Sequence, residues 1–125
     1  MVWMMVLPNG LLSFKIIEGK FNSIKYIALL CNSIVPIMKL NCGNDIWFQE
    51  DNSPVHKSKM VKDFILKSQI NVLEWPARSP DLNITEYLLK RISDDLYDVP
   101  QFNNRFDLIR KISDVIDQIN SSERR

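Results

Sequence analysis

Two acidic residues stand where a divalent-cation site can form. Asp51 follows the apolar run 46–49, at the carboxyl end of a predicted strand, and binding groups collect at such strand ends in open α/β sheets. Glu86 falls in the first turn of a predicted helix, with 34 residues between it and Asp51. Two carboxylates that converge from a strand end and a helix offer the hard oxygen ligands that Mg²⁺ prefers.

Each carboxylate also has an ordinary structural explanation. An Asp at a strand end is commonly a turn or cap residue, and a Glu in the first turn of a helix is favoured by the helix dipole. The placement of the two carboxylates alone therefore does not establish a metal site.

Hydrophobic periodicity and turn residues predict strands and helices around these two positions. Asn9-Gly10 predicts a hairpin turn, because both residues tolerate positive φ, and Pro36 is expected to end or kink the first helix. The predicted elements are a hairpin over 1–17, a helix over 22–38, a strand over 45–51, a helix over 58–69, a strand over 70–75, a helix over 82–97 that carries Glu86, and a helix over 105–120. This order predicts an α/β layer architecture.

Apolar residues at three- and four-residue steps predict the buried face of each helix. In helix 22–38 this stripe is Ile24, Ile27, Ala28, Cys31, Ile34, Val35 and Met38. In helix 58–69, which Ser58 is expected to cap, it is Met60, Val61, Phe64 and Ile65. The two later stripes are Leu82, Leu88, Leu89, Ile92 and Leu96, then Phe106, Ile109, Ile112, Ile116 and Ile119.

The composition narrows the class of protein. Of 125 residues, 46% are hydrophobic and 25% are charged, which favours a packed core over disorder. A net charge of +1 excludes a protein that binds nucleic acid by its overall charge alone. Cys31 and Cys42 are too few for a disulfide scaffold or a four-cysteine zinc site. Reduced, partly buried thiols are expected, with one disulfide as the alternative.

The apolar stretch 26–38 has 13 residues and contains Asn32, Ser33 and Pro36. It is too short and too interrupted to span a bilayer. The sequence therefore predicts a soluble intracellular protein that has no membrane partner.

Two longer segments around the carboxylates resemble the catalytic motifs of mariner-superfamily transposases. Residues 48–56, Phe-Gln-Glu-Asp-Asn-Ser-Pro-Val-His, are similar to the F-x-Q-D-N-x-P-x-H segment of that family. Residues 74–83, Glu-Trp-Pro-Ala-Arg-Ser-Pro-Asp-Leu-Asn, are similar to its W-P-A-x-S-P-D-L-N-P-I-E segment, which leads to the last catalytic carboxylate. The 34-residue separation matches one of the family's spacings. Weaker similarity over 1–3 and 17–26 extends the resemblance to nearly the whole chain.

The resemblance implies a ribonuclease-H-like fold, with a mixed sheet flanked by helices and a DDE active site. In that family two aspartates and a third carboxylate hold two Mg²⁺ (or Mn²⁺) ions, which stabilise the attacking and leaving oxygens of an in-line phosphoryl displacement. By this resemblance Asp51 is the second acidic ligand and Glu86 the third. The family's first aspartate lies on a central strand upstream of Met1-Val2-Trp3. That strand and its aspartate are therefore expected to be absent, and the chain is expected to be inactive alone.

Without the central strand, the family's strand order 3-2-1-4-5 has two unpaired edges. Either these edges pair directly, or another chain fills the gap, or the fragment is only marginally stable. Two local differences from the family also stand out. Glu50 replaces a Gln and adds a negative charge beside Asp51, and Ile84 replaces a Pro that favours the helix start.

Four residues beside the carboxylates are expected to shape the site. Asn52 is expected to hold its loop through local backbone bonds, and Asp81 or Asn83 to cap helix 82–97. His56 has three interpretations: it orients Asp51, contacts a phosphate, or caps the following helix.

Three basic residues are candidates for binding DNA phosphates. Arg78 lies in the loop that leads to Glu86, and Lys57 and Lys59 follow the Asp51 segment. A solvated helix face is the alternative explanation for the two lysines.

The resemblance predicts a fragment of a cut-and-paste DNA transposase that cleaves and joins DNA strands with a divalent metal. The partners expected of the complete protein are DNA, as transposon ends and target, and a second transposase subunit in a homodimer. Its expected location is the nucleus. The alternative is a non-enzymatic, transposon-derived protein that binds nucleic acid or another subunit.

Overall fold

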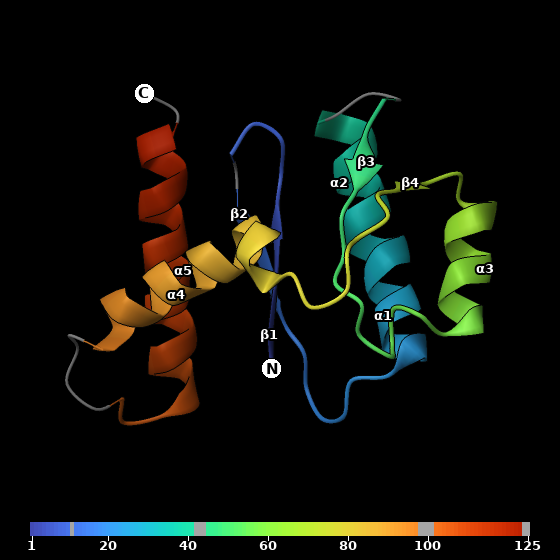
Figure 1. Cartoon of the computed structure of the whole chain (residues 1–125). Coiled ribbons are helices and arrows are strands. Elements are labelled where there is room, and N and C mark those ends of the chain that lie inside the picture. Colours follow the sequence, from blue (N-terminus) through green and yellow to red (C-terminus); the bar gives the residue numbers. More distant parts are fainter. Residues whose placement is uncertain (11, 42–44, 98–101, 124–125) are drawn as a thin grey trace. The chain divides into compact units, whose positions relative to one another are not determined.

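A computed structural model of the chain describes residues 1–10, 12–41, 45–97 and 102–123 (Figure 1). The chain divides into two compact units. The first unit contains Met1 and Ile17–Ser79, and the second contains Val2–Ile16 and Pro80–Arg125. The second unit is therefore built from two segments that are distant in the sequence.

The hairpin of the second unit consists of strands β1 (Val2–Val6) and β2 (Leu12–Ile16), which pair antiparallel. Its turn is closed by the Gly10 amide, which donates to the Leu7 carbonyl at 2.9 Å. Gly10 has a φ of 82°, whereas Asn9 does not share this positive φ. Glycine is thus required at position 10 only, because it has no Cβ to clash when φ is positive.

The helices of the second unit are α4 (Ile84–Tyr97) and α5 (Arg105–Glu123), preceded by a single 3₁₀ turn, η2 (Pro80–Leu82). α4 begins two residues later than predicted, because Asn83 is its cap and its side-chain oxygen accepts from the Thr85 amide at 3.1 Å. α5 continues three residues beyond the predicted end. The hydroxyls of Ser121 and Ser122 bond to carbonyls of its own last turns, which is compatible with a continuing helix.

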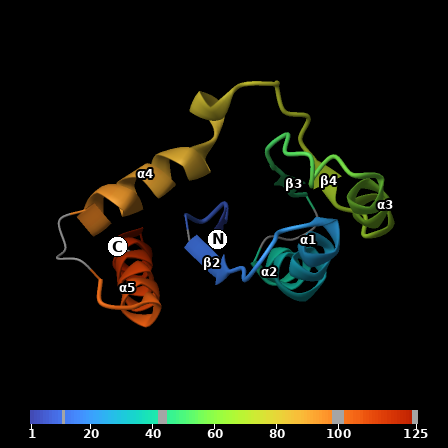
Figure 2. The same ribbon diagram turned by 90° about the horizontal axis from the view of Figure 1, so that it is seen from below.

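The core of the second unit lies between the hairpin and these two helices. α4 packs against β1 and α5, and α5 packs against β2 (Figure 2). The buried cluster is Met4, Leu12, Ile92, Ile112, Val115, Ile116 and Ile119. Phe106 and Leu82, which the periodicity places in the core, are 82% and 56% exposed. That prediction is wrong because α5 meets the hairpin through its C-terminal half and Leu82 precedes α4.

The side chain of Asn120 joins the two segments of the second unit, because it forms hydrogen bonds with the main chain of Leu12. The Asn120 amide oxygen accepts from the Leu12 N–H at 2.7 Å, and its nitrogen donates to the Leu12 carbonyl at 3.1 Å. Asn120 thereby pairs both backbone groups of Leu12, as a neighbouring strand would. It protects this position of β2 from pairing with another chain.

A long helical run forms one side of the first unit. It consists of α1 (Ser23–Leu29), a π-helical turn η1 (Leu30–Ile34) and α2 (Val35–Asn41). The run was expected to end or kink near Pro36. It does not end there but continues to Asn41, and its regular α-helical hydrogen bonding is interrupted just before Pro36. In the π-helical turn just before Pro36, the Val35 amide bonds to the Leu30 carbonyl five residues back. Such a local change of register accommodates the proline, which has no N–H to donate.

The buried face of this run is Tyr26, Leu30 and Ile34, at 1%, 0% and 0% exposure. The predicted stripe is displaced from it, since Ile24 is 66% exposed and Cys31 is exposed. Cys31 is a free thiol, so the expectation that it is partly buried is wrong, and Cys42 lies outside the described residues. Only one of the three buried residues, Ile34, belongs to the predicted stripe.

The segment Ser23–Leu40 has the length and composition of a membrane span. It has 18 residues with a mean hydropathy of 1.3, and 17% of it is buried. The helix is thus longer than the 13-residue apolar stretch that the sequence shows. Mostly buried core helices and signal sequences near the N-terminus pass the same test. In this chain the run places three side chains in the core of the first unit.

The strands of the first unit are short. β3 (Trp47–Phe48) pairs parallel with β4 (Asn71–Val72), and the Leu73 amide adds a bond to the Phe48 carbonyl at 2.9 Å. The strands predicted over 45–51 and 70–75 are therefore limited to two residues each. The structure forms two separate two-stranded sheets instead of the single sheet implied by the resemblance. Among the described residues there is no fifth strand to join them.

Helix α3 (Lys59–Lys67) follows β3 and packs against α1. Ser58 is at its N-cap, but the Ser58 side chain makes no capping bond and its Oγ is buried without a partner. At the other end, the Gln69 amide donates to the Leu66 carbonyl and the Ile70 amide to the Ile65 carbonyl. This is a Schellman motif, in which Gln69 occupies the left-handed position with a φ of 56°.

Replacing Gln69 with glycine should stabilise the chain by about 0.5–1 kcal/mol. The left-handed conformation costs an L-residue roughly 1–2 kcal/mol, which exceeds the roughly 0.5–1 kcal/mol of extra entropy that glycine loses on folding. Urea denaturation followed by circular dichroism measures the difference. Gln69→Ala is the control, because it keeps the Cβ and should bring no gain. A Gln69→Gly variant that is less stable than Gln69→Ala would contradict the prediction.

Candidate active site

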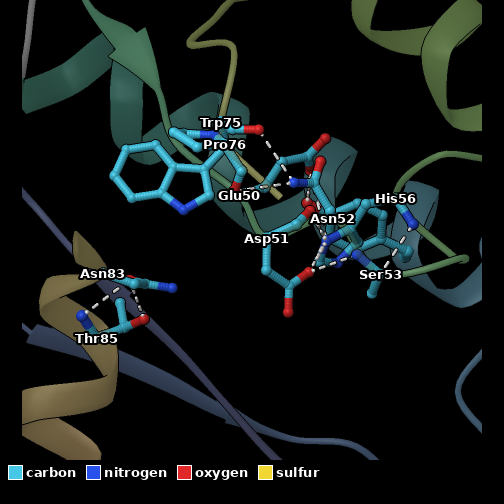
Figure 3. Close-up of polar contacts among 10 residues, drawn as sticks. Glu50, Asp51, Asn52, Ser53, His56, Trp75, Pro76, Asn83 and Thr85 are labelled. Atoms are coloured by element: carbon cyan, nitrogen blue, oxygen red, sulfur yellow. Dashed lines mark hydrogen bonds and ion pairs between the residues drawn. The ribbon is translucent and has the colours of Figure 1, made fainter. Parts of the chain in front are cut away.

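Asp51 lies in the first unit, three residues after the end of β3. The sequence places it directly after a strand, but the ladder ends at Phe48, which pairs with Val72. Its carboxylate is held at one oxygen. Asp51 Oδ1 accepts from the Ser53 amide at 3.0 Å and lies 2.6 Å from His56 Nδ1 (Figure 3). The Asp51 side chain is 58% exposed.

His56 is in the turn that leads into α3, and its side chain is 12% exposed. Besides Asp51 Oδ1, its Nδ1 lies 3.2 Å from the Asp51 carbonyl oxygen. Of the three interpretations of His56, the structure forms the contact that orients Asp51. The His56 backbone amide donates to Ser53 Oγ at 3.4 Å, inside the same turn.

Asn52 connects the two sequence motifs. Its Nδ2 donates to the Trp75 carbonyl at 3.1 Å and reaches the Pro76 carbonyl at 3.5 Å (Figure 3). The bonds expected for Asn52 were local ones within its own loop, and this expectation is wrong. Asn52 instead fastens the Asp51 loop to the loop that begins the second motif.

Glu50 and Tyr26 are part of the same site. The sequence showed the Glu50 charge beside Asp51, but it did not predict Tyr26 as a site residue. The Tyr26 hydroxyl donates to Glu50 Oε2 at 2.5 Å, and the Tyr26 ring lies against the His56 ring with centroids 4.3 Å apart. Burial raises the pKa of Tyr26 far above its usual value, and the Glu50 charge adds to the effect. The available signal was weak, because an aromatic residue within an apolar helix is usually a core residue.

Burial also raises the pKa of Glu50. The Asp51 charge acts in the same direction, whereas the Tyr26 hydrogen bond and His56 oppose it. A carboxyl group whose pKa is higher in the folded than in the unfolded chain contributes stability below the unfolded pKa. That contribution is lost as the pH rises through the folded pKa.

Replacing Glu50 with glutamine should therefore raise the free energy of unfolding at pH 7 and have little effect below about pH 4, where Glu is neutral in both states. Glutamine can still accept the Tyr26 hydroxyl. Urea denaturation at a series of pH values measures the difference between variant and parent. Glu74→Gln, at an exposed position, is the matched control. A variant that is less stable than the parent at pH 7 would refute the prediction.

Glu86 lies in the second unit, in the first turn of α4. Its amide donates to the Asn83 carbonyl at 3.1 Å, and its side chain is exposed. Asn83 also accepts from Thr85 Oγ1 at 2.6 Å, so it is the cap of α4 (Figure 3). Asp81 is exposed in η2. The joint action of Asp51 and Glu86 stays a prediction.

The three basic candidates are exposed: Lys57 and Lys59 beside the start of α3, and Arg78 in the loop after Trp75. Arg78 has a φ of 56°, which is unusual for a residue other than glycine. Within the part of the chain that the structure describes, no three His, Cys, Asp or Glu side chains gather as a metal site. The DNA-binding role of the basic residues stays a prediction.

The comparisons with known proteins agree with both motifs. Residues 1–109 match the family of DDE superfamily endonucleases. The transposable element Tcb1 transposase of Caenorhabditis briggsae is 34% identical over 92 residues, which cover 74% of this chain and 34% of that protein. The transposable element Tc3 transposase of Caenorhabditis elegans is 35% identical over 88 residues, which cover 70% of this chain and 27% of that protein. The chain thus spans about a third of the length of these relatives.

Solved structures agree with the fold. The Mos1 transposase catalytic domain, in a structure with Raltegravir and Mg, superposes with a TM-score of 0.68 at 16% identity, over 98% of this chain and 80% of that chain. A structure of the same domain with Raltegravir and Mn gives 0.65 at 18% identity, over 90% of this chain and 68% of that chain. The fold is therefore the ribonuclease-H-like fold of transposase catalytic domains.

The fold and the motifs define a DDE endonuclease domain. The chain belongs to the DDE superfamily of endonucleases, and it is homologous to the Tc1/mariner transposases. The resemblance predicted from the segments 48–56 and 74–83 is confirmed.

Proposed function

We propose that Asp51 and Glu86 hold a divalent cation, Mg²⁺ or Mn²⁺, for DNA strand cleavage and strand transfer in a cut-and-paste transposase. The observation that carries the proposal is the state of the Asp51 carboxylate. Its Oδ1 is occupied by Ser53 and His56, whereas no described residue donates to its Oδ2. An ordered carboxylate with one open oxygen is suited to bind a cation.

The donor set fits a hard cation. Both carboxylates are exposed, and carboxylate oxygens are the ligands that Mg²⁺ and Mn²⁺ prefer. The Mos1 domain was solved with each of these two metals. A cation bound in such a site neutralises the charge that develops on the phosphodiester oxygens during in-line displacement, and two ions are expected in the complete family domain.

The proposal extends to the partners of the complete protein. These are DNA, as transposon ends and target, and a second transposase subunit in a homodimer. Exposed Arg78, Lys57 and Lys59 are the candidates to contact DNA phosphates. We also propose the nucleus as the location of the complete protein.

Metal binding and DNA nicking test the function. The purified chain should bind Mn²⁺, as measured by the electron paramagnetic resonance signal of the free ion, and Asp51→Ala and Glu86→Ala should each weaken binding at least about tenfold. Any nicking of supercoiled plasmid in Mg²⁺ or Mn²⁺ should be lost in both variants. Asp63→Ala, at an exposed position on α3, controls for the loss of a carboxylate elsewhere. Mn²⁺ binding or nicking that survives both active-site substitutions would overturn the assignment of these residues.

A second candidate is a non-enzymatic protein that binds nucleic acid or a transposase subunit. It is favoured by large apolar side chains at the short β3–β4 sheet, since Trp47 is 63% exposed and Leu73 is 42% exposed. Exposed apolar patches often mark interaction sites. DNA or subunit binding without Mn²⁺ binding and without nicking would favour this candidate.

A further inference from the structure

Side chains from three parts of the first unit meet around His56. Tyr26 comes from α1 and is 1% exposed. Glu50 comes from the segment after β3, and its side chain is 13% exposed. The Tyr26 ring lies against the His56 ring at an interplanar angle of 33°, and the Tyr26 hydroxyl donates to Glu50 Oε2. A buried aromatic ring therefore fixes the positions of both the imidazole and the carboxylate.

Among the described residues, the polar atoms that lie against His56 Nδ1 are all hydrogen-bond acceptors. Asp51 Oδ1 lies at 2.6 Å, the Asp51 carbonyl oxygen at 3.2 Å and Glu50 Oε2 at 4.0 Å. Oxygens of this kind do not donate a hydrogen bond when the carboxylates are ionised. Nδ1 must therefore carry the proton, and the Nδ1–H donates a hydrogen bond to Asp51 Oδ1.

The consequence for Asp51 is that its carboxylate cannot turn freely. Oδ1 accepts from both His56 Nδ1 and the Ser53 amide, so rotation of the carboxylate would break two hydrogen bonds. Oδ2 remains on the side away from these contacts (Figure 3). Groups that fix a ligand's orientation in this way commonly contribute 10–100-fold to metal affinity, to order of magnitude.

We infer that Tyr26, Glu50 and His56 are positioning residues that hold the Asp51 carboxylate with Oδ2 open to a divalent cation. The inference rests on the proposed function of Asp51 as a metal ligand. Tyr26 supports the imidazole face and holds Glu50, Glu50 lies beside the Nδ1 side of the ring, and His56 makes the contact with Asp51. None of the three touches the cation or the DNA in this role.

The buried position of Glu50 is consistent with a functional role. A carboxylate that is 13% exposed beside a second carboxylate opposes folding. Unfavourable groups of this kind concentrate at functional sites.

The tautomer of His56 provides a test that does not depend on metal or activity. His56 is the only histidine of the chain, so its two ring nitrogens give unambiguous signals in a long-range ¹H–¹⁵N correlation spectrum. At a pH where the ring is neutral, the parent chain should show Nδ1 protonated. A ring protonated at Nε2 would overturn the inference.

The affinity for Mn²⁺ then shows whether the contact between His56 Nδ1 and Asp51 Oδ1 contributes to metal binding by Asp51. His56→Ala should weaken Mn²⁺ binding about tenfold or more, whereas His56→Asn should retain most of it, because the asparagine amide can replace Nδ1 as a donor. Glu50→Gln keeps an acceptor for Tyr26 and should stay within about threefold of the parent, whereas Glu50→Leu should lose about as much as His56→Ala. Tyr26→Phe keeps the ring but not the hydroxyl, and its matched control is Tyr87→Phe at a 69% exposed position.

The outcomes separate this inference from the proposed function. If Asp51→Ala weakens Mn²⁺ binding and His56→Ala does not, the positioning role is wrong and the metal site stands. If Asp51→Ala has no effect on Mn²⁺ binding, the proposed function fails. The positioning role of Tyr26, Glu50 and His56 then fails with it. Circular dichroism spectra that match the parent establish that each variant is folded. Loss of Mn²⁺ affinity in His56→Asn equal to that in His56→Ala would also contradict the role of the Nδ1 donor.

Discussion

Replacing Tyr26 with alanine is expected to lower the free energy of unfolding by about 3–5 kcal/mol, the range for removal of a buried aromatic side chain. The Tyr26 ring is 1% exposed and contacts the rings of Phe21 and His56, with centroids at 5.7 and 4.3 Å. The substitution leaves a cavity in the first unit. It also leaves the largely buried Glu50 carboxylate without its hydroxyl donor, which adds a desolvation cost.

Urea denaturation followed by circular dichroism at pH 7 measures this loss. Tyr26→Phe should cost much less, about 1 kcal/mol, because only the hydrogen bond is removed. Tyr87→Ala, at a 69% exposed position on α4, should change stability by no more than about 0.5 kcal/mol. A Tyr26→Ala variant as stable as Tyr87→Ala would show that the ring is not part of the core.

Replacing Ile116 with alanine is expected to cost about 2–5 kcal/mol. Ile116 is 4% exposed on α5 and belongs to the cluster that joins this helix to Met4 and Leu12 of the hairpin. The hairpin cannot bury its apolar face without the C-terminal helix, because the two segments form one unit. The loss of three carbon atoms therefore weakens the packing between the two ends of the chain.

The same denaturation experiment tests this prediction, with two variants for comparison. Ile116→Val removes one methyl group and should cost about 0.5–1.5 kcal/mol. Ile84→Ala, at a 58% exposed position at the start of α4, should be nearly neutral. A small effect of Ile116→Ala, together with an unchanged denaturation midpoint, would mean that α5 does not contribute to a common core with the hairpin.

The predicted site residues belong to two different units. Asp51, Asn52 and His56 belong to the first unit, together with Tyr26 and Glu50, and Glu86 belongs to the second with its cap Asn83. The Asn52 bonds to Trp75 and Pro76 hold the loop that leads from one motif to the next. A variant such as Asn52→Ala would therefore alter the segment that connects Asp51 to Glu86 and not only its own turn.

Local features were predictable because they depend on residues a few positions apart. The Asn9-Gly10 turn, the apolar periodicity of α3, α4 and α5, and the cap at Asn83 all have this character. The two catalytic motifs were readable for a similar reason, since each is a continuous segment. Their match to the DDE superfamily over residues 1–109 confirms the family.

The tertiary structure decided the contacts between segments that are distant in the sequence. Periodicity shows that α1 is amphipathic, but the buried face includes Tyr26 because its hydroxyl finds Glu50, 24 residues later. Asn120 stands at the predicted end of α5, and its side-chain amide pairs with Leu12, 108 residues earlier. The lengths of β3 and β4 depend in the same way on the partner strand that each can reach. The sequence by itself therefore determined the family, the motifs and most helices, whereas the buried faces and the residues that hold Asp51 follow from packing, which has no local signal.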